Sequence, residues 1–594
     1  MALLDECLAL ARVAGFYYIT RKLIAIGLAT ANVSFTTLAV ALSCINALLL
    51  NYVWERRSYG RSRRTHDESD QGPRLPPRYP CMIPFLGNVI PFLADSANSI
   101  RKAGSYAGNL VTTRVPFLGK DVYLIHDRET IRKVIKHQTL SSPMDLYIFS
   151  LKYMFGMPKR GLDAYRKDDS GPLSKPYHGS NVAPQDRIDY MLHENFIRQW
   201  SGPHHSTTTQ RFKRALVARF DSVGLDNQWE PVDDLYDMMA KRVSAALTES
   251  IFGPSLLRLN PNFIDDLWKY DDVVPYLVRG FPRWLMPAPY RIRDQLRGQI
   301  EKWYAYAREN FTADSIEADG DGDPYWGSEF VRHFQKMLSE SGHDDAMLSA
   351  QDFGTIWAAG SNTVPSVSIA CLHIFRDPVL LQRLRSEIDE AFPTAESLAS
   401  ASHQQLQKLP LLCSIFAETL RLHTKVFFGF SSPHEDAILG RYQLPKAQLG
   451  LWNSDLPHND DTFWNTKGGQ HPIKMFWADR FIVYPNDPES GPIRADLRKR
   501  EVKVADEKNG SKPAFTTEGL DGAWVPYGAG IPICPGRLIS KNVILHTTAF
   551  MVKNFDVELL TNRLEISNWR YGLGVGRPAH VVPARIKRRT EKDG

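Results

Sequence analysis

The chain has 594 residues, enough for one large catalytic domain or two ordinary ones. Its formal net charge of +6 is small and dispersed, which argues against a nucleic-acid partner. Its six cysteines lack the paired spacing of a disulfide framework. Together these features favour a globular enzyme in a reducing compartment over a secreted, disordered or nucleic-acid-binding protein.

Residues 1–54 form a predicted membrane-anchor region. No charged residue occurs from Leu23 to Trp54, and residues 33–54 are rich in Leu, Ala, Ile and Val. About 20 apolar residues cross the hydrocarbon core of a bilayer, so we expect a single span at about 33–54. Five arginines between positions 56 and 64 follow it, and three basic residues precede it, which predicts a cytosolic catalytic domain. A buried core helix is the alternative, and the sequence leaves open a second membrane-associated segment within residues 1–30.

A basic and proline-rich linker, residues 55–80, is expected to join the anchor to a catalytic domain, residues 81–594. Pro76, Pro77 and Pro80 fix the backbone φ angle and stiffen this linker. The alternation from residue 111 to 125 predicts a pair of strands, and a second small sheet is expected near residues 440–451. The acidic stretch 314–323 is predicted to be a solvated surface loop, because Pro324 occupies the turn-glycine position of a calcium loop.

The first sequence pattern that indicates chemistry lies in a helix predicted from about residue 349 to 375. Gly360 and Thr363 are three positions apart and share a helical face. The Thr363 hydroxyl can bond the carbonyl four residues earlier or be freed toward a ligand. Pro365 removes the N–H that would pair with the carbonyl of Ser361 and strains the turn. Taken alone, this pattern is also compatible with plain helix packing.

A second pattern places Glu418 and Arg421 on one face of a helix. Their neighbours are mostly apolar, so we expect the pair to be buried. A buried ion pair needs further hydrogen-bond partners to offset the lost hydration. The alternative is an ordinary surface ion pair, which contributes little to stability.

The third pattern is the run from Trp524 to Arg537, WVPYGAGIPICPGR, which ends just before a helix predicted over residues 538–552. The helix dipole and the free N–H groups at its start favour the thiolate form of Cys534. Gly528, Gly530 and Gly536 leave room for a flat ligand against the backbone. The alternatives are a dinucleotide-binding loop and a structural buried cysteine.

This run resembles the haem-binding signature of cytochrome P450, F-G-x-G-x-R-x-C-x-G. The resemblance implies that Cys534 is the proximal ligand of the haem iron. Tyr527 stands at the Phe position, and it is grouped with Gly530, Gly536 and Arg537 as cofactor-binding residues. Pro532 occupies the position at which the family usually has a basic residue paired with a haem propionate.

Residues 359–363, AGSNT, resemble the distal motif A-G-x-D/E-T of the same family, with Asn362 in place of the acid. The resemblance implies that Thr363 and Asn362 organise proton delivery as catalytic residues. The Asn is similar to that of the branch containing sterol 7α-hydroxylases and prostacyclin synthase. Part of that branch isomerises its substrate, and the retained Thr363 favours oxygenation.

Glu418 and Arg421 match the family's E-x-x-R motif, and residues 476–481, FWADRF, resemble its P-x-R-F segment with Ala478 in place of Pro. The resemblance therefore implies a structural triad of Glu418, Arg421 and Arg480 behind the haem loop.

Several weaker patterns relate to the same site. Trp200 offers only an incomplete W-x-x-x-R motif, since the following Gly-Pro is expected to break a helix, and it is not assigned a role. Three basic residues of the next helix are candidate propionate partners, although exposed surface charge is favoured: Arg211, Lys213 and Arg214. Residues 424–430 and 571–576 match pocket-lining regions of the family, and core packing explains their aromatic residues equally well.

The resemblance covers roughly residues 72–588. It implies a mainly α fold with small β-sheets, the cytochrome P450 fold, preceded by an N-terminal transmembrane helix. The implied enzyme binds haem b and inserts one oxygen atom from O₂ into a lipophilic sterol, terpenoid or other polycyclic secondary metabolite. Electrons are expected from NADPH through NADPH–cytochrome P450 reductase, with cytochrome b5 as a further candidate partner.

The same resemblance implies a single-pass protein of the endoplasmic reticulum membrane with a cytosolic catalytic domain. Its general character is similar to that of filamentous-fungal enzymes of secondary metabolism. Two alternatives remain at this stage. One is a haem-thiolate isomerase or dehydratase that needs no external electrons, and the other is a non-catalytic membrane haem-binding protein.

Overall fold

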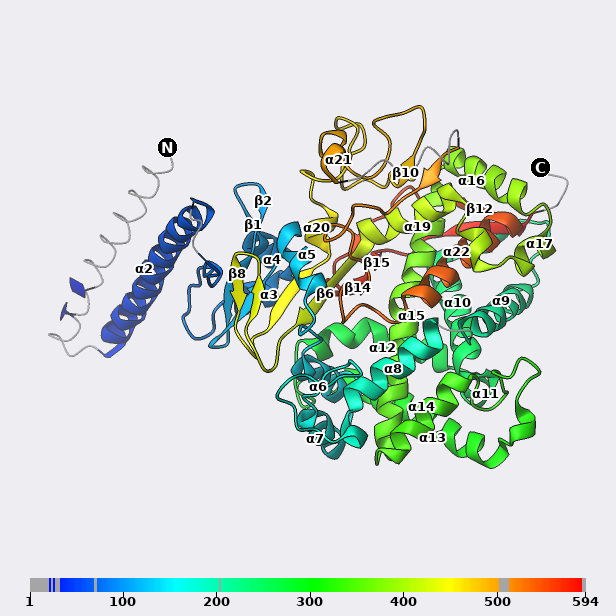
Figure 1. Cartoon of the computed structure of the whole chain (residues 1–594), viewed down its shortest axis with the longest axis horizontal. Coiled ribbons are helices and arrows are strands. Elements are labelled where there is room, and N and C mark those ends of the chain that lie inside the picture. Colours follow the sequence, from blue (N-terminus) through cyan, green and yellow to red (C-terminus); the bar gives the residue numbers. More distant parts are fainter. Residues whose placement is uncertain are drawn as a thin grey trace. The chain divides into compact units, whose positions relative to one another are not determined.

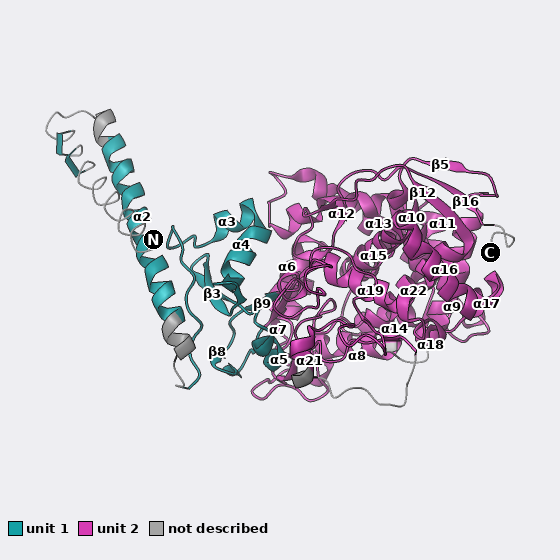
Figure 2. Cartoon of the chain, turned by 90° about the horizontal axis from the view of Figure 1, so that it is seen from above, with its two compact units in different colours: residues 1–134, 431–452 teal, residues 135–430, 453–594 magenta. Residues whose placement is uncertain are grey.

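The computed structural model describes residues 21–22, 25–26, 33–68, 72–201, 204–501 and 512–589. It divides into two compact units, residues 1–134 with 431–452 and residues 135–430 with 453–594 (Figure 2). Helices dominate, and the strands form small sheets (Figure 1). The prediction of a mainly α fold with small β-sheets is confirmed. A second membrane-associated segment within residues 1–30 falls almost wholly outside the described residues.

The first unit begins with the long helix α2, Val33–Glu68. Its segment Thr37–Arg63 is long and apolar enough to cross a membrane, and only 11% of its apolar window is buried. The helix continues past Trp54, so the start of the predicted linker is helical. There the Glu55 carboxylate accepts hydrogen bonds from Arg78 Nη1 at 2.8 Å and from the Cys81 N–H at 2.6 Å. These contacts fasten the charged end of α2 to the proline-rich segment.

Small sheets make up much of the rest of this unit. Strands β3 (Thr113–Phe117) and β4 (Lys120–Leu124) form an antiparallel hairpin. Both turn residues, Leu118 and Gly119, have positive φ angles, which suits the twist of a tight hairpin. Strand β4 also pairs in parallel with β9 (Gly450–Asn453), and β7 (Ala437–Leu439) pairs with β8 (Tyr442–Leu444). Both predicted strand regions are confirmed.

The remaining elements of the first unit are α3 (Val89–Ala94), α4 (Ser96–Gly104), β1 (Ser105–Tyr106), β2 (Asn109–Leu110) and α5 (Arg128–Lys136), which reaches the boundary with the second unit.

The second unit is built mainly from helices. Those before its longest helix are α6 (Met144–Tyr153), α7 (Lys159–Lys167), α8 (Ile188–Ser201), α9 (His204–Asp221), α10 (Leu235–Phe252), α11 (Pro254–Leu259), α12 (Phe263–Val278), α13 (Pro287–Asn310) and α14 (Glu329–Glu340). The others are α15 (Asp345–Arg376), α16 (Pro378–Ala391), α17 (Ala395–Ser400), α18 (His403–Leu406), α19 (Pro410–His423), α20 (Asp455–His458), α21 (Ala495–Glu501) and α22 (Arg537–Asn554).

Short strands complete this unit: β5 (Glu230–Val232), β6 (Thr424–Phe430), β10 (Ile482–Val483), β11 (Ala514–Phe515), β12 (Phe555–Leu559), β13 (Ile566–Ser567), β14 (Leu573–Val575), β15 (Arg577–Pro578) and β16 (Ala584–Arg588). Strands β12, β16 and β5 form one sheet, in that order. Strand β14 pairs antiparallel with β6, so that Leu573 lies opposite Val426 and Val575 opposite Thr424.

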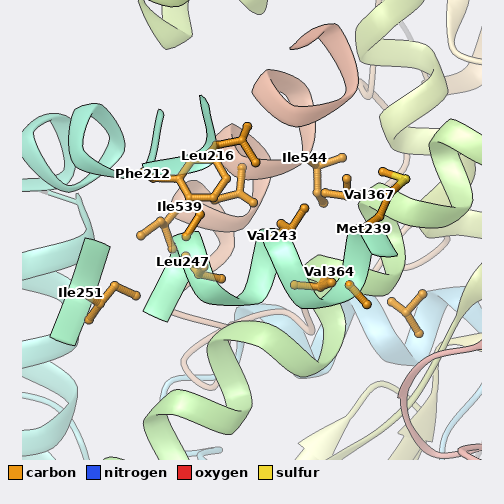
Figure 3. Close-up of a cluster of buried hydrophobic side chains, with 14 of the residues drawn as sticks. Phe212, Leu216, Met239, Val243, Leu247, Ile251, Val364, Val367, Ile539 and Ile544 are labelled. Carbon is orange, nitrogen blue, oxygen red and sulfur yellow. The ribbon is translucent and has the colours of Figure 1, made fainter. Parts of the chain in front are cut away.

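Helix α15 is the central element of the second unit and packs against α10, α13, α19 and α22 (Figure 1). Figure 3 shows an apolar cluster to which α9, α10, α15 and α22 contribute. Val364 and Val367 of α15 and Ile539 and Ile544 of α22 belong to this cluster, together with side chains from α9 and α10. One core therefore holds both the helix with the Gly360–Thr363 pattern and the helix that follows Cys534.

This arrangement predicts a large cost for removing one side chain from the shared core. Ile544 is 1% exposed, so Ile544→Ala should lower the free energy of unfolding by about 2–5 kcal/mol, because the removed methyl groups leave a cavity. Leu560→Ala is the control, since Leu560 is 56% exposed. Denaturant unfolding of both variants measures the difference, and equal destabilisation would contradict the placement of Ile544 in the core.

Candidate active site

Cys534 lies in a tight loop at the start of α22. Its N–H donates to the Tyr527 carbonyl at 2.8 Å, which closes the loop. Gly528 and Gly530 have φ angles of 73° and 70°, a left-handed conformation that other residues rarely adopt. Gly536 is the N-cap of α22, so the free N–H groups of the first turn lie next to the cysteine.

The Cys534 side chain is exposed, although protein closely surrounds it. Burial raises the pKa of its thiol, while the Gly536 N–H and the Arg537 charge oppose that rise. The other cysteines of the second unit, Cys371 and Cys413, are buried, and burial raises the pKa of each to about 12. Cys534 is therefore the thiol of this unit that a ligand can reach.

Aromatic side chains lie against the glycines of the loop. A Cβ atom at Gly528 would come within 2.9 Å of the Phe428 ring. A Cβ atom at Gly536 would lie 3.2 Å from the Trp200 ring and 3.8 Å from Cys534 Sγ. The glycines thus allow rings to approach the backbone beside the sulfur. Trp200, which sequence analysis did not assign, therefore lies beside Gly536. Helix α8 ends at Ser201 and α9 begins at His204, and the helix break predicted at Gly-Pro lies outside the described residues.

Tyr527 precedes Cys534 in the chain and Arg537 follows it, and each contacts a neighbouring residue. The Tyr527 hydroxyl makes a long contact of 3.4 Å to Ser540 Oγ, and burial raises its pKa. Arg537 Nη1 donates to the Cys534 carbonyl at 3.2 Å. Both predicted cofactor-binding residues therefore belong to the cysteine loop and the first turns of α22.

The structure brings Glu418, Arg421 and Arg480 together in a fully buried network, with each residue 0% exposed. Arg421 binds the Glu418 carboxylate through two hydrogen bonds of 2.6 and 2.8 Å, and Arg480 Nε binds it at 3.0 Å. The Trp477 N–H donates to the same carboxylate at 3.1 Å. Burial alone would raise the pKa of Glu418, but the two guanidinium groups outweigh it and lower the pKa below its ordinary value.

The remaining donors of the two arginines bind backbone carbonyls. Arg421 donates to His458 O at 2.7 Å and to Ile473 O at 2.8 Å, and Arg480 donates to Asn465 O. These bonds supply the further partners that a buried ion pair requires. The network therefore fixes the chain between β9 and β10.

His458, which sequence analysis missed, connects this network to the cysteine loop. Its Nε2 accepts a hydrogen bond from the Val525 N–H at 3.0 Å, and burial lowers its pKa to about 3. The imidazole is therefore neutral, as an acceptor Nε2 requires. Trp524 Nε1 also donates to the Ala417 carbonyl on α19 at 3.2 Å. The start of the cysteine loop is thus held by the residues that surround the Glu418 network.

On α15, the two predicted catalytic residues have different partners. Asn362 Oδ1 accepts a hydrogen bond from the Val575 N–H of β14 at 3.0 Å. A Cβ atom at Gly574 would overlap that oxygen, so only glycine fits there. The Thr363 hydroxyl lies 3.1 Å from Ser540 Oγ on α22. The sequence left two alternatives for this hydroxyl, the carbonyl four residues earlier or a ligand, and its observed partner is a second hydroxyl.

The two predicted pocket segments, residues 424–430 and 571–576, meet in the β6–β14 pair. Val426, Phe427 and Phe428 are half-buried, whereas Phe430 is fully buried and belongs to the core. Through Asn362, this sheet is bonded directly to the Gly360–Thr363 turn of α15. The half-buried side chains therefore lie on β6, and its partner strand β14 contacts that turn.

The three basic candidates on α9 have protein partners elsewhere. Arg211 pairs with Asp319 at 3.2 Å and Asp321 at 2.5 Å, and Arg214 pairs with Glu317 at 3.7 Å. Lys213 donates to the Ala401 carbonyl at 3.0 Å. Arg211 is largely buried, contrary to its prediction as exposed charge.

The solvated-loop prediction for residues 314–323 is wrong for Asp321 and Asp323, which are each 2% exposed. Asp321 pairs with Arg211 and Asp323 with Arg332. Their buried charges are offset by arginines from α9 and α14, which the local acidic composition does not reveal.

Comparisons with known proteins relate the chain to one family. A sequence model of the family "Cytochrome P450" matches residues 248–467, which include α15 and α19. The cytochrome P450 monooxygenase efuG of Hormonema carpetanum is 29% identical over 93% of this chain and 96% of its own length. The cytochrome P450 monooxygenase fsoE of Humicola fuscoatra is also 29% identical, over 90% and 92%. The cholesterol 7-alpha-monooxygenase of Cricetulus griseus is 25% identical over 86% and 93%.

The chain belongs to the cytochrome P450 family, as its helical fold and near full-length relatives establish. It is a cytochrome P450 monooxygenase.

Membership in the family implies a haem-thiolate centre, and the residues present fit one. Cys534 offers an accessible sulfur at a helix start, where the dipole favours the thiolate. Thiolate is a soft ligand that suits haem iron. Gly528 and Gly536 keep the backbone beside the sulfur free of side chains. Bound iron would overcome the raised pKa of the free thiol, because a coordinating thiol is deprotonated.

The buried Glu418 network predicts a severe effect of neutralising its carboxylate. Glu418→Gln leaves two buried guanidinium groups without their counter-charge and should cost about 3–5 kcal/mol of unfolding free energy. Glu390→Gln is the matched control, because Glu390 is exposed on α16. Denaturant unfolding and haem content measured on both variants test this, and equal stability of the two would contradict the network's role.

The lowered pKa of Glu418 also predicts acid sensitivity. The stabilisation is complete above the pKa of an unfolded Glu, about 4.3, and is lost as the pH falls through the lower folded pKa. The stability of the wild-type chain should therefore fall more steeply below about pH 4.3 than that of Glu418→Gln. Parallel pH profiles would argue against the assigned charge.

Proposed function

We propose that this monooxygenase binds haem b through Cys534 and inserts one oxygen atom from O₂ into a lipophilic substrate, while the other atom leaves as water. The observation that carries the proposal is the accessible Cys534 thiol, enclosed by protein at the start of α22. Tyr527, Gly530, Gly536 and Arg537 form the cofactor-binding loop around it. Haem bound there supplies the redox chemistry of oxygen activation.

The chain's own contribution to the reaction is proton delivery and positioning. The Thr363 hydroxyl can both accept and donate a proton, and Ser540 Oγ lies 3.1 Å from it. Ser540 also lies 3.4 Å from the Tyr527 hydroxyl, so three hydroxyl groups form a row from α15 to the cysteine loop. Asn362 holds its turn against β14 through Oδ1, which leaves its Nδ2 group to orient water. Glu418, Arg421 and Arg480 are structural and support the loop.

We further propose that residues 1–54 anchor the chain as a single-pass protein of the endoplasmic reticulum membrane, with residues 55–80 as linker and residues 81–594 as the cytosolic catalytic domain. The apolar Thr37–Arg63 segment supports the anchor. Electrons come from NADPH through the membrane-bound NADPH–cytochrome P450 reductase, with cytochrome b5 as a second donor.

The proposed substrate is a sterol, terpenoid or other polycyclic compound of fungal secondary metabolism that arrives through the bilayer. The half-buried Val426, Phe427 and Phe428 support an apolar contact surface. One relative is named as acting on cholesterol, a polycyclic lipid. Regiochemistry depends on contacts with the substrate itself.

The experiment that tests the proposal is the absorption spectrum of the reduced, carbon monoxide-bound full chain. A strongly red-shifted Soret band of thiolate-ligated haem is expected, and Cys534→Ala should abolish it. Cys44→Ala, which removes an exposed cysteine of α2, should leave the band unchanged. Haem without the shifted band, or a shifted band that survives Cys534→Ala, would overturn the ligand assignment.

Thr363→Ala removes the proposed proton donor, so NADPH consumed per product should rise at least about tenfold while the CO-bound band is retained. Ser368→Ala is the control, because this buried hydroxyl on the same helix donates to Val364 O within its own turn. Product and NADPH are measured together with excess reductase, and an unchanged ratio in Thr363→Ala would contradict the role of the hydroxyl.

A further inference from the structure

A proline in α15 leaves one backbone carbonyl without its helical donor. Pro365 lies inside the helix and has no N–H, so the carbonyl of Ser361 cannot form the usual bond to residue 365. Ser361 is 4% exposed and directly precedes Asn362 and Thr363. A buried acceptor without a donor is costly, so the fold needs a donor from another element at this turn.

Arg570 supplies that donor. Its Nη1 lies 3.0 Å from Ser361 O and 3.1 Å from Val575 O. The side chain is 4% exposed and comes from the turn between β13 and β14. Burial lowers the pKa of Arg570 to about 10, so the guanidinium stays protonated at neutral pH.

Asp271 of α12 provides the counter-charge. Its carboxylate, 1% exposed, pairs with Arg570 Nη2 at 3.1 Å and with Arg577, and accepts a hydrogen bond from Trp357 Nε1 at 2.6 Å. Trp357 lies four residues before Ser361 and therefore on the same face of α15. One carboxylate thus contacts α15 directly at Trp357 and, through Arg570, one turn later at Ser361.

Val575 closes the arrangement. Its carbonyl accepts from Arg570, and its N–H donates to Asn362 Oδ1 at 3.0 Å. Val575 of β14 is therefore bonded both to Arg570 and to Asn362, which lies in the turn that Arg570 contacts. Displacing the guanidinium would break its hydrogen bonds to the carbonyls of Ser361 and Val575 together.

We propose that Arg570 is a positioning residue, which replaces the helical hydrogen bond lost at Pro365 and fixes the Ser361–Thr363 turn against β14. The inference rests on the proposed function in one respect, because the turn matters for turnover only if Asn362 and Thr363 act in it. The hydrogen-bond replacement itself is a structural claim that stability measurements test independently.

The test is a double-mutant cycle between Arg570 and Pro365 on the full-length holoenzyme. Arg570→Met should raise the unfolding constant ~10- to 100-fold, because hydrogen bonds from a charged donor are lost at a buried site. Pro365→Ala restores an N–H that can bond Ser361 O. In the Pro365→Ala background, the effect of Arg570→Met on the unfolding constant and on product per NADPH should therefore shrink at least about threefold.

Arg577→Met is the matched control, because Arg577 also pairs with Asp271 and has Asp272 as its other partner at 2.7 Å. Its effect should be the same with and without Pro365→Ala. Arg570→Lys, which keeps a positive charge beside Asp271, repeats the cycle if Arg570→Met does not fold. Equal effects of the Arg570 variants in both backgrounds would overturn the proposal. Loss of the CO-bound thiolate band in the wild-type chain would instead overturn the proposed function and leave the stability cycle valid.

Discussion

The buried carboxylate of Glu418 is the interaction on which the cysteine side of the site depends. It neutralises Arg421 and Arg480, and these arginines use their remaining N–H groups to hold backbone carbonyls between β9 and β10. One of those carbonyls belongs to His458, whose neutral imidazole accepts from Val525 at the start of the cysteine loop. The position of Cys534 therefore follows from a charge balance inside the protein. Neither arginine could remain buried without the carboxylate, because the lost hydration of a charge is offset only by a partner.

The part of the site on α15 depends on a helical hydrogen bond that Pro365 removes. Pro365 frees the carbonyl of Ser361, and the residues that meet this need come from α12 and from the β13–β14 turn. The same turn of α15 bonds β14 through Asn362 and α22 through Thr363 and Ser540. Helices α15 and α22 also share one apolar core (Figure 3). The turn proposed as catalytic is thus joined to β14, which pairs with the strand β6 that bears the proposed substrate-contacting side chains, and to the helix that follows the cysteine.

The sequence predicts those features that local spacing determines. The helix after Cys534, the helix that contains Pro365, and the shared face of Glu418 and Arg421 all follow from patterns within a few residues. Contacts between segments that are distant in the sequence do not follow from such local patterns. Arg570 lies 209 positions from Ser361, and Thr363 lies 177 positions from Ser540, so no local pattern indicates either pairing. The surface-loop prediction was wrong at Asp321 for the same reason, because Arg211 of the distant helix α9 brings the charge that allows this carboxylate to be buried. Proline chemistry does predict that Ser361 needs a donor, although not which residue provides it.

Iron X-ray absorption on the ferric full-length protein tests directly whether Cys534 ligates the haem iron. We expect one sulfur atom in the first coordination sphere of the iron, contributed by the Cys534 thiolate that the loop and the start of α22 present. Cys534→Ser should replace this scatterer with oxygen or leave the position empty. A coordination sphere of nitrogen and oxygen alone in the wild-type protein, with the fold intact, would contradict the assignment of Cys534 as the haem ligand.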